Sequence, residues 1–149
     1  MRTVKDTVEE VVTAPAQLIR ITAVVRRVVQ EMHMGPMDNA ARVRVQFLLR
    51  ECLAELDECL DSSLNAELRR VVRIDLAGCT EKSLHVAMAT LLGWLEGLVD
   101  GIQMALTAQR LATVADARNK ISQEGTALSF NGLNRTTGAR ESVRTGQYL

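Results

Sequence analysis

The sequence has few aromatic residues and no excess of basic charge. Aromatic residues are limited to Phe47, Trp94, Phe130 and Tyr148, while Leu, Ala, Val and Arg are abundant, a composition that favours helix over strand. Basic and acidic side chains number 18 each, so the net charge gives no basic footprint for binding nucleic acid. The longest uncharged stretch around Trp94, residues 83–95, is too short to cross a bilayer, and we expect no membrane contact.

Cysteine is also scarce, with Cys52, Cys59 and Cys79 only. The number is odd and residues 1–10 carry no apolar core of a secretory leader, so we expect a reduced, cytoplasmic setting. Cys52 and Cys59 lie seven residues apart, on one face of a helix. No histidine cluster or further cysteine lies close by to complete a metal site. We therefore interpret both as small buried apolar residues and predict no metal or cofactor.

The candidate catalytic groups are few and isolated. His33 and His85 have no neighbouring pair of nucleophile and carboxylate, so we interpret both as surface or interface residues. Glu96 and Asp100 lie one helical turn apart, which is more typical of a solvated or interface-facing pair than of acid–base chemistry. No glycine-rich segment leads into Gly-Lys-Ser/Thr, so the chain lacks a P-loop. We predict no enzyme activity.

Periodicity predicts an all-α domain over residues 15–119, preceded by a flexible segment at 1–14. Thr13 and Pro15 mark the start of a helix over residues 16–33, and Gly35-Pro36 ends it, with the glycine as a left-handed cap. A second helix is predicted over residues 38–61, broken by Ser62-Ser63. A short third helix is expected over residues 64–74, followed by a loop at 75–80.

The most regular helix begins after Thr80 and is predicted to end at Ala117 or Arg118. Its apolar residues alternate at spacings of four and three, which predicts a seam in a helical bundle or coiled coil. Gly93, Gly97 and Gly101 follow one another at intervals of four, and we interpret them as sites where another backbone approaches closely, within the bundle or between subunits. The seam consists of Leu84, Met88, Leu91, Leu95, Leu98, Ile102 and Ala105.

Residues 120–149 differ in composition from the rest of the chain. Glycine, serine, threonine and asparagine are frequent and apolar residues become isolated, so we predict a disordered tail. This tail ends in Gly146-Gln147-Tyr148-Leu149. Tyr148 offers a large apolar ring and a hydroxyl group, and the carboxylate of Leu149 is an anion that a lysine or backbone N–H groups hold well. On its own, so short a motif fits a docking site or merely the place where the chain stops.

The long helix and the C-terminal motif together resemble a known family. Residues 91–110 read LLGWLEGLVDGIQMALTAQR, which is similar to the signature helix of the bacterial proteasome activator family, with GWLEGL followed by GIQ-AL-AQ. That family also ends in GQYL. The resemblance covers roughly residues 15–118 and then resumes at Gly146. Gln147 departs from the hydrophobic-Tyr-any pattern of proteasomal ATPase rings, a departure that the family shares.

The resemblance implies a four-helix-bundle subunit that assembles into a dodecameric ring and caps the proteasome core without ATP. It further implies that Tyr148 and Leu149, positioned by Gly146 and Gln147, enter pockets between adjacent α subunits, open the gate and promote the degradation of unfolded proteins. The alternative from another functional class is an oligomeric helical adaptor or scaffold, whose C-terminal tail is captured by some other carboxylate-binding partner.

Overall fold

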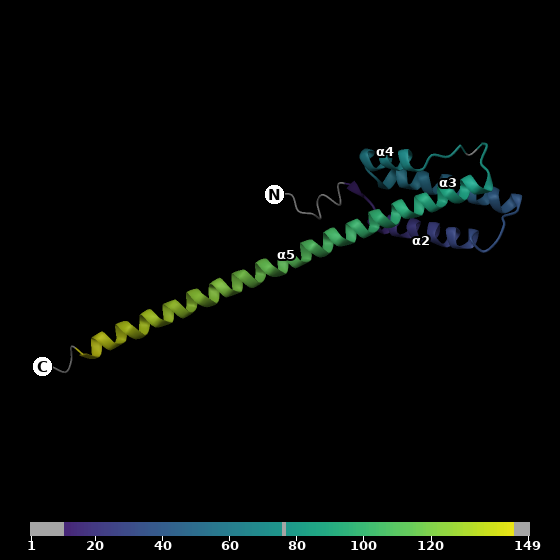
Figure 1. The fold of residues 1–149 in the computed structure, drawn as a ribbon. Helices are drawn as coiled ribbons and strands as arrows, with labels where there is room; N and C mark the ends of the chain where they lie inside the picture. The colour runs from purple at the N-terminus through teal and green to yellow at the C-terminus, as the bar shows by residue number, and fades with distance from the viewer. Residues whose placement is uncertain (1–10, 76, 145–149) are drawn as a thin grey trace. The chain divides into compact units, whose positions relative to one another are not determined.

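The structure is a computed structural model that describes the backbone of residues 11–75 and 77–144 and the side chains of residues 11–75 and 77–129. Its named elements are four helices: α2 (Pro15–Met32), α3 (Asn39–Cys59), α4 (Ser62–Val71) and α5 (Glu81–Arg144) (Figure 1). The chain divides into two units, Met1–Leu106 and Thr107–Leu149, which are described separately. The predicted all-helical class, with a long C-terminal helix, is confirmed.

Helix α2 begins and ends near the predicted residues. Pro15 occupies its first turn, where a proline sacrifices no hydrogen bond. Its end differs from the prediction, because no described glycine has a positive φ and Gly35 is therefore no left-handed cap. His33 instead keeps right-handed helical angles and its N–H bonds back to the carbonyls of Val29 and Gln30. Gly35 then precedes Pro36, a position that disfavours helix.

Aspartate side chains cap both α3 and α4. Asp38 accepts a hydrogen bond from the Ala41 N–H at 2.6 Å, and Asp61 accepts one from the Leu64 N–H at 2.8 Å, the usual way to satisfy the free amides of a first turn. The predicted break at Ser62-Ser63 is wrong by two residues, because Ser62 already belongs to α4. The break lies at Leu60, which is extended, and Asp61 restarts the helix.

The segment before α2 contacts the chain between α3 and α4. Val12 is buried and forms an antiparallel bridge with Leu60, and the Thr13 N–H donates to the Cys59 carbonyl at 3.0 Å. The extended residue Leu60 thus offers this segment a backbone partner, and the flexibility predicted for residues 1–14 stays a prediction. Residues 1–10 of that predicted segment lie outside the described residues.

The core of the first unit lies between α5 and the three shorter helices. Thr80 caps α5 as predicted, since its hydroxyl accepts from the Ser83 N–H at 3.2 Å. Four of the predicted seam residues are fully buried, and burial of each such side chain contributes about 1.5–3 kcal/mol. Leu98 and Ile102 are half-buried against the same core. The fully buried seam residues are Leu84, Met88, Leu91 and Leu95.

In the second unit α5 continues to Arg144, so the predicted helix end at Ala117 or Arg118 is wrong. Every described side chain from Arg110 to Ser129 is exposed, and this stretch contains no proline and a single glycine, Gly125. Alanine, leucine, arginine and glutamine favour helix locally, and no tertiary packing selects another conformation. The predicted change of character after Lys120 stays a prediction.

Candidate functional site

The four predicted docking residues, Gly146, Gln147, Tyr148 and Leu149, lie outside the described residues. The site can therefore be built only from the helix that precedes them and from the signature stretch within the bundle. Their role as a docking motif stays a prediction.

The signature stretch holds α5 against its neighbours on three sides. Leu95 is fully buried in the core. Trp94 donates its indole N–H to the carboxylate of Glu67, on α4, at 2.9 Å. Glu96 forms an ion pair with Arg26, on α2, also at 2.9 Å. The GWLEGL motif thus provides one core residue and one polar contact to each of α4 and α2.

The glycines of this helix do not pack against anything within the subunit. A Cβ atom built on Gly93, Gly97 or Gly101 would have no heavy atom within 4 Å outside the local backbone. The interpretation of a close approach within the bundle is therefore wrong, because these glycines lie on the side of α5 that faces away from the core. The alternative of a close approach between subunits stays a prediction, even though each glycine costs the helix up to about 1 kcal/mol relative to alanine.

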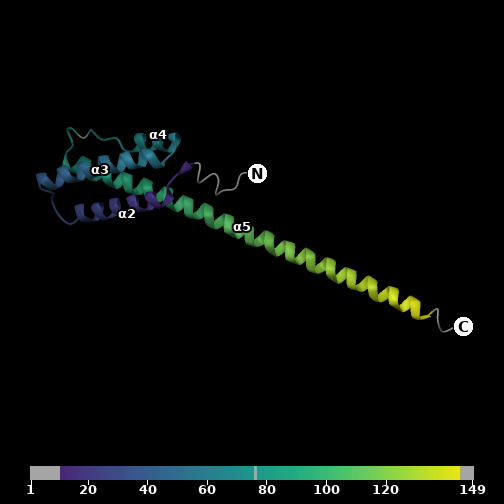
Figure 2. The same ribbon diagram turned by 180° about the vertical axis from the view of Figure 1, so that it is seen from behind.

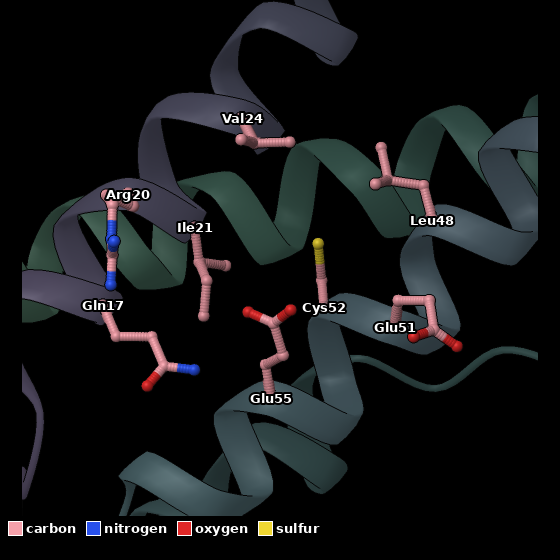
Figure 3. Close-up of a pocket in the computed structure, with 8 residues that line it drawn as sticks. All are labelled: Gln17, Arg20, Ile21, Val24, Leu48, Glu51, Cys52 and Glu55. Carbon is pink, nitrogen blue, oxygen red and sulfur yellow. The ribbon is translucent and has the colours of Figure 1, made fainter.

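An amphipathic groove between α2 and α3 was not predicted. Figure 3 shows Ile21 and Val24 from α2 opposite Leu48 and Cys52 from α3, with charged side chains at the rim. The groove has a volume of about 470 Å³. No short motif encodes it, because it arises only where two apolar stripes diverge. The rim consists of Gln17, Arg20, Glu51 and Glu55.

The thiol in this groove is chemically quiet. Burial, followed by the nearby carboxylates of Glu55 and Glu51, raises the pKa of Cys52 from 9.0 to about 11. Burial likewise raises the pKa of Cys59. Both side chains are buried and unpaired, so the prediction that they act as small apolar core residues is confirmed. Near neutral pH neither presents the thiolate that nucleophilic or redox chemistry requires.

The two histidines meet where α2 ends and α5 begins. Their rings lie edge to face at 5.9 Å between centroids, and His85 is 3.9 Å from the carboxylate of Glu81. His33 contacts the Val29 carbonyl through Nδ1 at 2.6 Å. Contacts of this kind link the ends of two helices. Within the described residues, no group of three or more His, Cys, Asp or Glu is placed to hold a metal ion.

None of the described helices is long and apolar enough to span a membrane. Glu96 and Asp100, the remaining carboxylates considered from the sequence, differ in their surroundings. Glu96 is occupied by Arg26, whereas Asp100 is exposed on the outward side of α5. The partners of Trp94 and Glu96, which are Glu67 and Arg26, were not predicted from the sequence. From the sequence these two are only charged residues at the edges of the apolar stripes of α4 and α2.

Comparison with known proteins gives one consistent result. The profile of the family described as Bacterial proteasome activator matches residues 2–149. A protein named Bacterial proteasome activator in Mycolicibacterium smegmatis is 33% identical over 145 residues, covering 94% of this chain and 81% of the relative. Its namesake in Mycobacterium tuberculosis is 31% identical over 147 residues, with coverages of 97% and 81%. The Mycobacterium leprae protein is 32% identical over 142 residues, with coverages of 94% and 79%. This helical chain, with its signature residues tying α5 into the bundle, belongs to the bacterial proteasome activator family.

Proposed function

We propose that the chain is an ATP-independent activator of the bacterial proteasome core particle. Copies of the chain form a ring, dodecameric by resemblance, that caps the core cylinder. Gly146, Gln147, Tyr148 and Leu149 bind pockets between neighbouring α subunits and open the gate to unfolded proteins. The observation that carries the proposal is the ending GQYL on a chain whose family relatives are named as proteasome activators.

The chemistry of the ending supports this role. The Tyr148 ring provides apolar area and a hydroxyl, and the Leu149 carboxylate provides one negative charge that a positively charged or amide-lined pocket can hold. A single contact of this size is weak. Several tails on one ring bind at high effective concentration once the first has bound, so that the assembly binds far more tightly than one tail.

The second unit is suited to act as a tether between the helical bundle and the C-terminal docking residues. From Arg110 to Ser129 no described side chain is buried, and an isolated helix without tertiary packing is only marginally stable in water. We propose that residues 120–144 exchange between helix and coil. Such exchange would let tails from a twelve-fold ring adjust to the seven-fold α ring that the resemblance implies.

The proposal assigns no catalysis, cofactor, membrane or nucleic-acid partner to the chain. It places the protein in the cytoplasm, where the buried thiols of Cys52 and Cys59 stay reduced. The ring, the proteasome α subunits and unfolded polypeptides are its proposed partners.

The test combines the full chain with purified proteasome core and an unstructured protein substrate, without nucleotide. We expect faster degradation, and we expect deletion of Tyr148 and Leu149 to remove the stimulation. Ser142→Ala, which lies in the same segment but outside the four docking residues, is the matched control and should keep the stimulation. Absence of stimulation by the intact chain, together with capture of a different partner by the tail, would favour the adaptor or scaffold instead.

A further inference from the structure

Two helix faces of the first unit expose apolar side chains away from the core. On α3, Val43 is 54% exposed and Phe47 is 62% exposed. On α5, Met104 is 73% exposed. Side chains this large seldom stand in water in a row without a partner surface. The neighbouring pair Val43 and Phe47 on α3 therefore indicates a surface that is covered by a partner outside the single chain.

The two faces carry residues at the same spacing. The α3 outer stripe consists of Val43, Phe47, Arg50 and Ala54, with steps of four, three and four residues. The α5 outer stripe consists of Gly93, Gly97, Asp100 and Met104, with the same steps. All eight residues are exposed. Two helices that run in the same direction with equal spacing can pack residue against residue along their length.

The helix directions meet this condition. In Figures 1 and 2, α3 and α5 run the same way through the bundle, whereas α2 runs the opposite way. The first residues of the two helices also lie together, because the Met37 N–H just before α3 donates to Glu81 at 3.1 Å. A ring relates its copies by a modest rotation, so α3 of one copy and α5 of the next keep a common direction. Such head-to-tail interfaces join two different faces of the subunit.

Charge then selects one register. Arg50 is the only cation of the α3 outer stripe, and Asp100 is the only anion of the α5 outer stripe. Neither side chain forms an ion pair or hydrogen bond with another residue that the structure describes. Placing Arg50 opposite Asp100 aligns Phe47 with Gly97, Val43 with Gly93 and Ala54 with Met104. In every apolar pair of this register, a large side chain meets a small one.

We propose that the α3 outer stripe of one copy packs in parallel on the α5 outer stripe of the next copy, with Arg50 paired to Asp100 and Phe47 seated over Gly97. The inference deepens the proposed ring by naming the surfaces that join its subunits. It also gives the signature glycines a purpose, since only residues without side chains leave room for Phe47 and Val43. Within the subunit a Cβ on Gly93 or Gly97 would meet nothing within 4 Å.

The first test is Gly97→Leu in the full chain, with oligomeric state measured by native mass spectrometry or light scattering without proteasome. The open surroundings of Gly97 allow the subunit to fold with the added side chain, and far-UV circular dichroism and thermal unfolding check this directly. We expect the assembly to dissociate while the subunit stays folded. Gly125→Leu is the matched control, because Gly125 is equally open and lies outside both stripes. Unchanged assembly of folded Gly97→Leu would overturn the proposal.

The second test reverses the charges. Arg50→Asp and Asp100→Arg should each weaken assembly at least tenfold, because each places like charges opposite one another. The double variant, in which every interface again pairs opposite charges, should recover assembly. Failure of the double variant to recover, with both single variants folded and dissociated, would contradict the proposed pairing.

These outcomes separate the interface from the proposed function. If the intact chain assembles and stimulates the proteasome, but Gly97→Leu and the charge reversals leave assembly unchanged, the interface is wrong and the activator function stands. If Gly97→Leu abolishes stimulation without changing assembly, the α5 outer stripe receives another partner and the interface is again wrong. If the intact chain assembles as described but never stimulates the proteasome, the proposed function fails and the interface stands.

Discussion

The two units of this chain contain the same kind of helix in opposite surroundings. In the first unit, α5 places Leu84, Met88, Leu91 and Leu95 completely out of solvent. In the second unit the same helix exposes its large apolar residues, with Leu111 at 67% and Leu128 at 73%. Apolar residues continue into the second unit, but they are more widely spaced there. The buried residues of the first unit are those that α2, α3 and α4 cover.

This difference in burial indicates that the first unit provides most of the free energy of folding, whereas the helix of the second unit contributes little to it. Helical stability in proteins comes mostly from packing of an apolar face rather than from local propensity. The backbone of residues 107–144 is helical, and the described side chains from Arg110 to Ser129 are all exposed.

The largest expected difference between the units is in the free energy of unfolding that is lost when a leucine is replaced by alanine. Leu95→Ala should destabilise the bundle by about 2–5 kcal/mol, because it leaves a cavity in a fully buried position. Leu111→Ala, its counterpart on the exposed part of α5, should change the free energy of unfolding by less than about 0.5 kcal/mol. Urea unfolding of both variants at one protomer concentration checks this. Equal losses would show that the second unit is packed in the native protein.

Alkaline pH should act on the first unit through Cys52. Its pKa is raised from 9.0 to about 11 in the folded chain, so the unfolded chain ionises first as pH rises. The stabilisation is complete below pH 9 and is lost between about pH 9 and pH 11, by roughly 2–3 kcal/mol. Unfolding measured across this range should show the loss, and Cys52→Ala should reduce the slope.

Removing the hydrogen bond between Trp94 on α5 and Glu67 on α4 should have a smaller effect. Trp94→Phe deletes the hydrogen bond to Glu67 and should cost about 1 kcal/mol, beyond the modest loss of ring area. A double-mutant cycle with Glu67→Ala measures the coupling between the two side chains. Additive effects of the two substitutions would contradict a direct interaction in solution.

The smallest effect is expected from helix propensity in the second unit. Gly125→Ala should raise helix content around residue 125, since alanine favours helix over glycine by up to about 1 kcal/mol. The free energy of unfolding of the bundle should stay within about 0.5 kcal/mol of the parent. Hydrogen exchange resolved along α5 measures both. A change in exchange at buried Leu91 would show that the units are coupled more tightly than the comparison suggests.

Much of the bundle could be predicted from sequence because its signals are local. Asp38, Pro15 and Thr80 mark helix starts through chemistry that acts within one turn, and each was predicted within one or two residues. The contact between Val12 and Leu60 could not be predicted, because the two residues are distant in sequence. The left-handed cap predicted at Gly35 was wrong for a local reason, since His33 closes the last turn with right-handed helical angles.

The site was predictable to a different degree. The signature stretch indicates the family from the sequence alone. The contacts of its residues could not be predicted, because Glu67 and Arg26 lie 27 and 70 positions away from their partners. The regular spacing of the glycines is visible in the sequence, but their location on the outward side of α5 follows only from the packing of the other helices. The C-terminal motif stays a sequence-based prediction, because residues 145–149 lie outside the described part of the chain.

The C-terminal residues of the chain are the proposed proteasome anchor. This anchor is tested by comparing the intact chain with a version extended by one alanine after Leu149, in nucleotide-free degradation of an unstructured protein by purified proteasome core. We expect the extended chain to assemble normally but to stimulate no better than the chain lacking Tyr148 and Leu149, because its carboxylate is displaced by one residue. Equal stimulation by the extended and intact chains would show that the carboxylate of Leu149 is not part of the anchor.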